Sequence, residues 1–413
     1  MKQKLFILAA VALGLASCSN DTVTEESQSA KDANTISFRS FVGGQTRAAD
    51  ITTDGIASFN VEAFTTGQTA TPYFSNVTFS KDGAGTFNSV NKYYWPTTNL
   101  DFYAYSPVTA DVSGTQKGAL SNGSYQIEKT DFQTFTITPS TTVGDQVDFV
   151  YANSNNKSKT TTGGVAGAIA LNFRHAGAKI VIKVKNSSST LKFYVEGIKI
   201  ANVDGSATFT YSKTNDVSTE GTGLLRYADW TNNNNAATAS YSKTFTANAI
   251  AVSQATAQFL GATGTPYTTT QAVADNTALN MILIPQQTTA ATAYSDNAGN
   301  ALVTTGSYIA LKMKIRNNDA HGDDGTGTGD GTLIANATAD NKWAMWPVAF
   351  NWEPGKQYTY TIDLEDGGYW ESNTADGNAD LDAILEGAVI KFVSVTVDNW
   401  SDATGINVSG PAL

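Results

Sequence analysis

Apolar and polar residues alternate with a period of two wherever the chain is apolar. In residues 178–185 (AKIVIKVK) the isoleucines face one way and the lysines face the other. Residues 308–316 (YIALKMKIR) and 357–364 (QYTYTIDL) repeat this alternation. Such a period is typical of β-strands that bury one face and leave the other face in water.

Many further segments fit the same pattern and are separated by turns rich in Gly, Asn, Asp and Ser. They are residues 35–42 (TISFRSFV), 57–64 (ASFNVEAF), 100–107 (LDFYAYSP), 132–139 (FQTFTITP), 147–153 (VDFVYAN), 191–200 (LKFYVEGIKI), 280–285 (NMILIP) and 389–400 (VIKFVSVTVDNW). Residues 378–388 (NADLDAILEGA) are the best candidate for a helix, and this segment is short. We therefore predict an all-β fold built from β-sandwiches.

Residues 153–164 (NSNNKSKTTTGG) contain no apolar residue and end in two glycines. We predict a domain boundary there, which gives an N-terminal β-sandwich in residues 48–163 and a C-terminal β-sandwich in residues 164–413. Long stretches rich in Asn, Thr, Ala and Gly in the second half are expected to be surface loops.

The first 17 residues have the layout of a signal peptide, with two early lysines and an apolar run that is too short to span a bilayer. The ending LASC looks like a bacterial lipobox, in which Cys18 is acylated and becomes the first residue after cleavage. The alternative is an ordinary signal peptide with an accidental cysteine. Cys18 is the only cysteine, so no disulfide framework is expected. Residues 19–34 are polar and acidic, which is typical of a tether.

The charge of the chain argues against a nucleic-acid partner. It has 26 basic and 37 acidic residues, a net charge of -11, and no block of Lys and Arg that could follow a phosphate backbone. The two histidines, His175 and His321, are far apart, and we expect His175 to be a hydrogen-bonded structural residue. No GxSxG, HExxH or P-loop pattern occurs. We predict neither an enzyme nor a cofactor, although a hydrolase that relies on paired carboxylates remains an alternative.

Two other groups of residues suggest binding sites. Asp323, Asp324 and Asp330 in HGDDGTGTGDG supply oxygen ligands that suit calcium, but they lack the terminal glutamate of an EF-hand loop, so an ordinary loop is preferred. Aromatic clusters could stack on sugar rings, but large aromatic side chains more often fill the cores of sandwiches. These aromatic residues are Tyr93, Tyr94, Trp95, Trp343, Trp346 and Trp352.

Several phrases taken together resemble one family. They are LNFRHAGAKIVIKV, YYWPTTNLDFYAYSP, LIPQQT, WPVAFNWEPGKQYTYTIDL and the closing FVSVTVDNW. Their order and spacing resemble the fimbrillins, the type V pilins of Gram-negative anaerobes, in the minor-fimbrium-like branch. The resemblance implies two transthyretin-like β-sandwich domains in tandem, a lipoprotein precursor of the outer membrane, and polymerisation by donor-strand exchange. It also implies that an extracellular arginine-specific protease removes an N-terminal segment, and that a C-terminal strand of a neighbouring subunit fills the groove left open.

Arg47 is the candidate for this cut, with Arg47 and Ala48 forming the scissile bond. A protease needs an extended and exposed target, which GGQTRAAD permits. Upstream, Ile36, Phe38 and Val42 alternate like a strand that fills the groove before the cut. Residues 18–47 would then be a propeptide that combines an acidic tether and a plug strand. The alternative is that Arg47 is an ordinary linker residue with no role in processing.

Two C-terminal segments could be the donor strand. Val393, Val395 and Val397 alternate in the last apolar segment, and Ile406 and Val408 come later in a polar tail. Burying a few such side chains in a neighbour's groove is favourable, and hydrogen bonds of the β-ladder add to it. The sequence leaves both segments open, and we favour the later one.

The sequence therefore predicts a fimbrial subunit of a surface filament used for adhesion. It is expected to carry fatty acid (palmitate) on Cys18, and its expected partners are copies of itself or other fimbrial subunits, the protease, the outer membrane and a host or bacterial receptor. The alternative is an anchored surface lipoprotein that binds glycans. Whether the subunit forms the shaft, the tip or the anchor is left open, as is the receptor.

Overall fold

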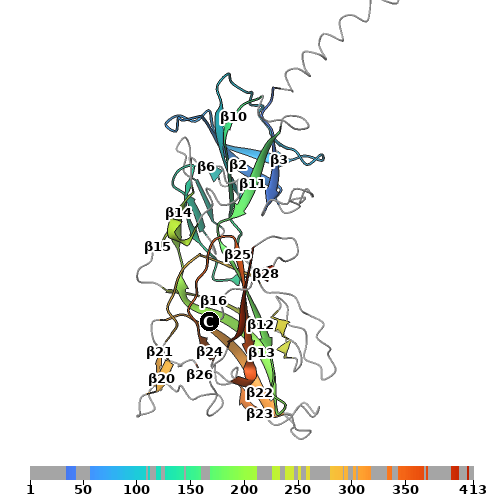
Figure 1. The fold of residues 1–413 in the computed structure, drawn as a ribbon, viewed down its shortest axis with the longest axis vertical. Coiled ribbons are helices and arrows are strands. Elements are labelled where there is room, and N and C mark those ends of the chain that lie inside the picture. The colour runs from blue at the N-terminus through green and yellow to red at the C-terminus, as the bar shows by residue number, and fades with distance from the viewer. Residues whose placement is uncertain are drawn as a thin grey trace, which may run out of the picture.

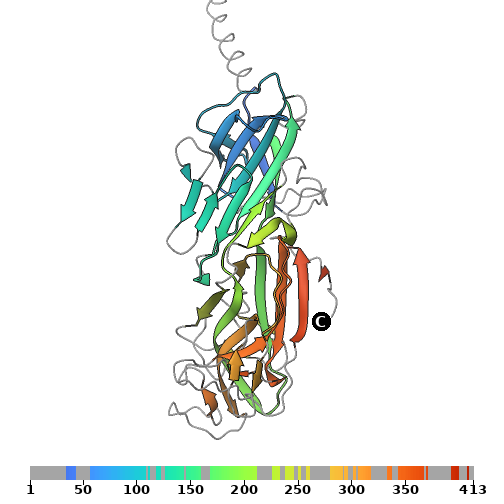
Figure 2. The same ribbon diagram turned by 90° about the vertical axis from the view of Figure 1, so that its left-hand side faces the viewer.

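A computed structural model gives the fold of the chain. The residues that the structure describes are 34–42, 56–107, 110–111, 118–121, 126–143, 146–159, 168–211, 226–232, 238–245, 250–252, 257–260, 280–291, 293–295, 301–303, 306–317, 333–336, 343–366, 369–370, 392–399 and 407–408. They form strands and two short 3₁₀ helices, η3 (Tyr227–Asp229) and η4 (Leu364–Asp366). The predicted all-β class is confirmed, and the strands gather in two lobes that lie end to end (Figures 1 and 2).

The N-terminal lobe is built around a sheet that closes on itself. In spatial order its strands are β1 (Phe38–Val42), β11 (Ile169–His175), β10 (Val150–Lys157), β5 (Leu100–Ser106), β2 (Ser58–Thr65), β3 (Phe74–Lys81) and β4 (Phe87–Ser89). The ring closes because β1 pairs with β11 on one side and with β4 on the other.

A second sheet packs against this closed sheet. Its strands in order are β15 (Trp230–Asn232), β14 (Ala207–Thr210), β9 (Thr134–Thr138), β8 (Gln126–Lys129), β7 (Gly118–Ser121) and β6 (Ala110–Asp111). Aromatic rings join the two sheets, since the ring centroid of Phe135 on β9 lies 4.9 Å from that of Tyr105 on β5 and 4.8 Å from that of Phe149. The core of this lobe is therefore mainly aromatic.

The C-terminal lobe has two main sheets whose facing sides form a second core. One sheet contains β18 (Gln258–Phe259), β12 (Ala178–Lys185), β25 (Lys356–Asp363), β27 (Phe392–Asn399) and β28 (Asn407–Val408), with β19 (Met281–Leu283) also paired to β12. The other contains β16 (Thr238–Thr244), β13 (Leu191–Asp204), β22 (Tyr308–Asn317), β24 (Ala344–Pro347) and β26 (Tyr369–Trp370), with β17 (Ile250–Ala251) and β23 (Leu333–Asn336) at its sides. A hairpin of β20 (Ala293–Ser295) and β21 (Ala301–Val303) completes the described strands.

The chain first leaves the N-terminal lobe after β11, later than the sequence suggests, and it returns to that lobe for β14 and β15. The boundary expected between residues 163 and 164 lies between β10 and β11, which pair with each other in the closed sheet. Asn153, where the expected strand 147–153 meets the expected boundary, and Ser154 within that boundary are both buried in β10 and pair with β5. The physical reason is that the backbone makes the ladder hydrogen bonds, so a strand between paired neighbours does not need apolar side chains.

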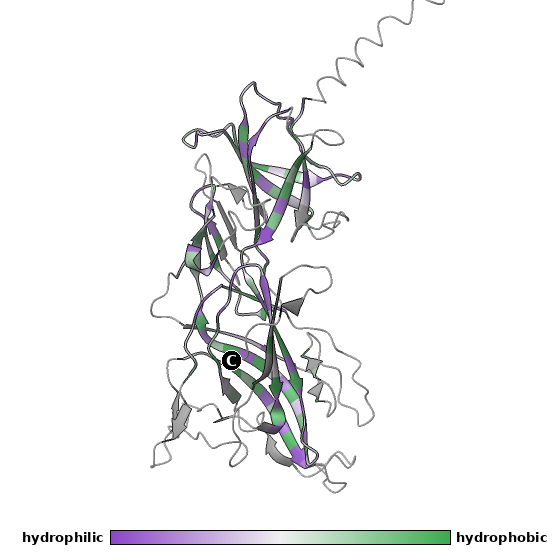
Figure 3. Cartoon of the chain, in the orientation of Figure 1, coloured by the Kyte–Doolittle hydropathy of each residue, from purple (hydrophilic) through white to green (hydrophobic). Residues whose placement is uncertain are grey.

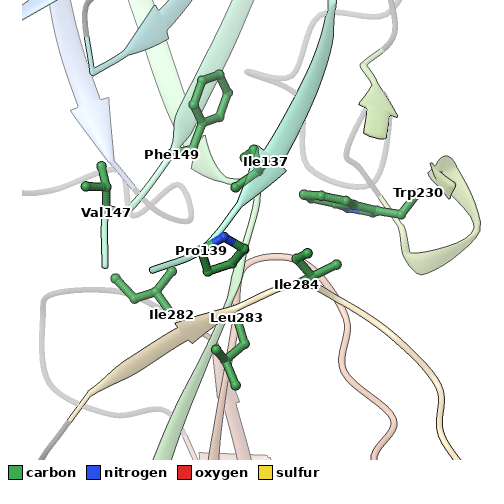
Figure 4. A pocket seen from close by; sticks show the side chains of 9 residues that line it. Ile137, Pro139, Val147, Phe149, Trp230, Ile282, Leu283 and Ile284 are labelled. Carbon is green, nitrogen blue, oxygen red and sulfur yellow. The ribbon is translucent and has the colours of Figure 1, made fainter. Parts of the chain in front are cut away.

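The two lobes meet across an apolar seam (Figure 4). Apolar side chains of both lobes line it. They are Ile137, Pro139, Val147, Phe149 and Trp230 of the N-terminal lobe, and Ile282, Leu283 and Ile284 of the C-terminal lobe. At the same place the backbone N–H of Ile282 donates a 2.8 Å hydrogen bond to Oε1 of Gln146. The seam therefore joins the lobes through packing and a polar contact.

The predicted alternation is visible along the strands (Figure 3). On β22, Ile309, Leu311 and Met313 are buried, while Lys312 is half-buried. On β25, by contrast, the side expected to be wet is also buried, since Thr359 and Asp363 are only 8% and 5% exposed. The candidate helix at residues 378–388 lies outside the described residues.

Candidate functional site: the bed of the N-terminal strand

The first described strand, β1, lies in the closed sheet between β11 and β4. It runs parallel to β11, with pairs from Phe38↔Ile169 to Val42↔Phe173, and antiparallel to β4 at Phe38↔Phe87. Just before β1 the backbone N–H of Ile36 donates a 2.8 Å hydrogen bond to the carbonyl oxygen of Tyr93. A strand at the N-terminal end of the chain thus closes the sheet on both of its sides.

Ile36 and Phe38 of this segment face the core, as the sequence predicts, although Ser37 between them is also buried. Ile36 and Phe38 are almost completely buried, whereas Arg39 is exposed. The ring of Phe38 lies edge-on to the rings of Phe79 and Phe102, at centroid distances of 4.7 and 5.3 Å. Edge-to-face contacts of this kind add to the free energy of burial. Phe38 is therefore part of the centre of the aromatic core.

Losing this strand would expose a groove. The facing edges of β11 and β4 would lose their ladder partner, and the rings of Phe79 and Phe102 would lose the ring that packs between them. Burial of Ile36 and Phe38 alone contributes about 3–6 kcal/mol. We call the groove between β11 and β4 the bed of β1. It can be kept closed only by a strand that supplies both backbone hydrogen bonds and alternating apolar side chains.

Four of the residues predicted for processing and exchange lie outside the described residues: Cys18, Arg47, Ala48 and Ile406. Val393, Val395 and Val397 lie on β27, which pairs with β25 from Lys356↔Asn399 to Ile362↔Phe392. Val408 lies on β28 and pairs with Val397.

The side chains of Val395 and Val397 are half-buried and pack against the core of the C-terminal lobe. Among the described strands, only the two-residue β28 lies beyond β27 in this sheet. The valines of β27 therefore belong to their own lobe, next to the outer edge of the sheet.

His175 stands at the end of β11, the neighbour of β1. It is 5% exposed, and its Nδ1 lies 2.7 Å from Oδ2 of Asp148. This contact confirms the expected hydrogen bond of the histidine. His321 and the aspartates at 323, 324 and 330 lie outside the described residues, and within the described part of the chain no group of three His, Cys, Asp or Glu side chains could hold a metal ion.

The aromatic clusters belong mostly to the cores. Trp95 is 8% exposed and lies edge-on to Phe102. Trp352 is completely buried, stacks on Phe350 and donates a 2.9 Å hydrogen bond from Nε1 to the hydroxyl of Tyr360. The faces of these two indoles are therefore not available to a sugar ring.

Sequence reasoning missed one polar cluster in the N-terminal lobe. Glu62 and Lys129 form a completely buried ion pair beside Asn76, Tyr105 and Asn60. One signal was present, because Glu62 is the only charged residue in the predicted strand ASFNVEAF. The partner on another sheet could not be read from that pattern.

The family model described as "Fimbrillin-like" matches residues 46–400. The chain belongs to the fimbrillin-like family. The match begins next to Arg47, so β1 lies outside the matched residues of this fimbrillin-like chain.

Two solved structures match most of this chain at low sequence identity. A fimbrial protein from Bacteroides vulgatus is 14% identical, with 89% of this chain and 100% of that chain covered at a TM-score of 0.49. A proposed cell adhesion protein from Bacteroides uniformis is also 14% identical, with 89% and 99% covered at a TM-score of 0.40. No curated protein matches this chain. Among the described helices none is long and apolar enough to cross a membrane.

Proposed function

We propose that this fimbrillin-like chain is a fimbrial subunit that is cut after Arg47 and polymerises by donor-strand exchange into a cell-surface filament used for adhesion. The observation that carries the proposal is the position of β1. This strand precedes Arg47 in the chain, buries Phe38 in the core, and pairs with β11 along its length and with β4 at Phe38. Membership of the fimbrillin-like family supports the same class of function.

The cut would act by changing the effective concentration of β1. Before the cut, β1 is tethered to the sheet that it fills, so its binding is intramolecular and outcompetes any strand from solution. Cleavage after Arg47 leaves β1 held by non-covalent contacts alone. A strand from a neighbouring subunit can then replace it if that strand offers apolar side chains at every second position.

The donor would come from the C-terminal end of the neighbour. Ile406 and Val408 have the required spacing and come after β27, whereas Val395 and Val397 contribute to the core of their own lobe. We therefore assign the donor to the tail that carries Ile406 and Val408. In this arrangement each subunit keeps β27 and offers only the segment beyond it.

The location of the precursor depends on its N-terminus. Acylation of Cys18 would anchor it in the outer membrane, and the cut after Arg47 would release the rest of the chain into the filament. Its partners would then be copies of itself or other fimbrial subunits, the arginine-specific protease and a surface receptor. A glycan-binding role could not use Trp95, Trp346 or Trp352, which are buried, and among the predicted aromatic residues it would have to rely on Tyr94, which is 40% exposed.

The test is to treat the purified precursor with an arginine-specific protease. We expect a product that begins at Ala48 and a ladder of oligomers that survives mild heating in detergent. Arg47→Ala should leave the fold intact, as measured by circular dichroism, and abolish both the product and the ladder. The matched control is Arg39→Ala, because Arg39 lies within β1 where the ladder hydrogen bonds resist threading into a protease.

Two results would contradict the proposal. One is a ladder of the same intensity from the Arg47→Ala precursor. The other is cleavage at Ala48 without any oligomer, which would leave processing in place and remove strand exchange.

A further inference from the structure

The buried polar cluster of the N-terminal lobe is not used by strand exchange. Lys129 extends from β8 of the second sheet, and Glu62 extends from β2 of the closed sheet. Both side chains are completely shielded from solvent, and Nζ of Lys129 contacts Oε1 of Glu62. Among the described residues, Oε2 of Glu62 has no hydrogen-bond partner. Burying two charges is costly, and passing one proton from the ammonium to the carboxylate removes both charges.

An amide side chain lies against this pair. Nζ of Lys129 is 3.4 Å from Oδ1 of Asn76, and the carbonyl carbon of Asn76 is one bond from that oxygen. Asn76 reaches the pair because the register of β2 and β3 shifts opposite Glu62, and because its φ of 51° lies in the left-handed region that asparagine tolerates. Bulges of this kind redirect side chains.

The carbonyl group of Asn76 is also polarised. The hydroxyl of Tyr105 donates to Oδ1 of Asn76, and Nδ2 of Asn60 donates to the same oxygen at 2.5 Å. Nζ of Lys129 lies 3.3 Å from the hydroxyl of Tyr105 and 5.3 Å from the centroid of its ring. Asn76 itself is half-buried. Donors aimed at a carbonyl oxygen stabilise the negative charge that develops when a nucleophile adds.

Lys129 thus offers a nucleophile, Glu62 a base and Asn76 an amide, and the donors to Oδ1 of Asn76 form an oxyanion site. We propose that Lys129 and Asn76 form an intramolecular isopeptide bond, with Glu62 as the base. Holding the amine and the amide at this separation replaces a slow bimolecular reaction with an intramolecular one, for which effective concentrations are very high. The proposal goes beyond strand exchange and does not depend on it.

The reaction balances without an oxidant or a cofactor. Glu62 takes a proton from Nζ of Lys129, and the neutral amine adds to the carbonyl carbon of Asn76. Nδ2 then takes the proton from Glu62 and leaves as ammonia, so the bond between the carbon and Nδ2 breaks as the new bond to Nζ is kept. The new amide nitrogen returns one proton to Glu62, which ends neutral in its dry site.

The bond would join β3 to β8, and thus the closed sheet to the second sheet. β3 pairs with β4, which forms one wall of the bed of β1. A covalent link there would hold this wall in place while β1 is absent. It would also carry tension between the two sheets without relying on packing.

The test is the intact mass of the full chain with its expected N-terminus. The proposal requires a mass lower than the sequence mass by one ammonia molecule, and a branched peptide in which Lys129 is joined to Asn76 after digestion. A mass equal to that of the sequence, with both residues found in linear peptides, overturns the proposal and leaves an ordinary buried ion pair.

Variants assign the roles. Asn76→Ala and Glu62→Gln should each restore the full sequence mass, and the control Asn88→Ala, an exposed asparagine on the neighbouring strand β4, should still lose ammonia. Circular dichroism checks that each variant is folded. If Glu62→Gln does not fold, the mass of the unaltered chain still decides the matter. Loss of ammonia from folded Asn76→Ala would overturn the assignment.

Discussion

The first and last long strands of the described chain are held in very different ways. β1 has a partner on both sides and places Phe38 among three other phenylalanine rings. β27 pairs along its length with β25 alone, has only the short β28 beyond it among the described strands, and leaves Val395 and Val397 half-buried. Figure 2 shows the two strands in different lobes.

This difference shows where a barrier to exchange would lie. Removing β1 opens a closed sheet and an aromatic core, whereas moving the short strand β28 disturbs few contacts. A subunit built in this way stays closed until something weakens its hold on β1, and the proposed cut after Arg47 does so. The contrast predicts that substitutions on β1 lower the free energy of unfolding the most and that substitutions on β27 lower it the least.

The largest expected effect is that of Phe38→Ala in the uncut precursor. Removing a completely buried phenylalanine costs about 3–5 kcal/mol, because the lost contacts are joined by a cavity. Urea unfolding followed by intrinsic fluorescence would measure this loss of unfolding free energy. Arg39→Ala on the exposed face of β1 is the control and should change little. A loss below about 1 kcal/mol for Phe38→Ala would mean that the core does not depend on β1.

The fold class and most strands could be predicted because they depend on local alternation. Residues 178–185 and 191–200, expected to be strands, form β12 and most of β13. The partners of each strand could not be predicted in this way. β1 pairs with β11, which is more than a hundred residues later in the chain, and a period of two carries no information on such a partner.

In the candidate site, too, local alternation predicted the direction of side chains but not the partners that they meet. The inward direction of Ile36 and Phe38 was predicted from alternation, and the structure places both in the core. The cluster of Glu62, Asn76 and Lys129 was missed, because its members come from three strands and meet only when two sheets pack. The buried polar side of β25 was missed for a related reason, since periodicity cannot show whether a second layer covers a face.

A moderate loss of unfolding free energy is expected for Asp363→Asn. Asp363 lies on β25, the strand that pairs with β27, so this substitution tests how firmly β25 is held. Burial by itself raises the pKa of Asp363, but hydrogen bonds from Lys185, at 2.8 Å, and from Ser187 outweigh it and hold the pKa below its usual value. The carboxylate therefore stabilises the fold above the pKa of the unfolded chain, and this contribution is lost as the pH falls through the folded pKa. Losing hydrogen bonds to a charged group costs about 2 kcal/mol at neutral pH.

Urea unfolding at a series of pH values measures this effect. The difference between Asp363→Asn and the unaltered chain should shrink as the pH falls through the acid range. Glu365→Gln, an exposed neighbour, is the control and should show no such trend. A difference that stays constant down to acid pH would mean that the charge of Asp363 does not stabilise β25.

The smallest effect is expected for Val397→Ala on β27, and it can separate the two candidate donors. Removing two methyl groups from a half-buried valine costs about 1 kcal/mol in the monomer, and Thr396→Ala on the opposite face is the control. If the tail with Ile406 and Val408 is the donor, Val397→Ala weakens the monomer and the assembled filament equally. Thermal dissociation of filaments in detergent compares the two. A much larger loss in the filament would show that β27 itself is exchanged, and β27 would then resemble β1 in being a removable strand.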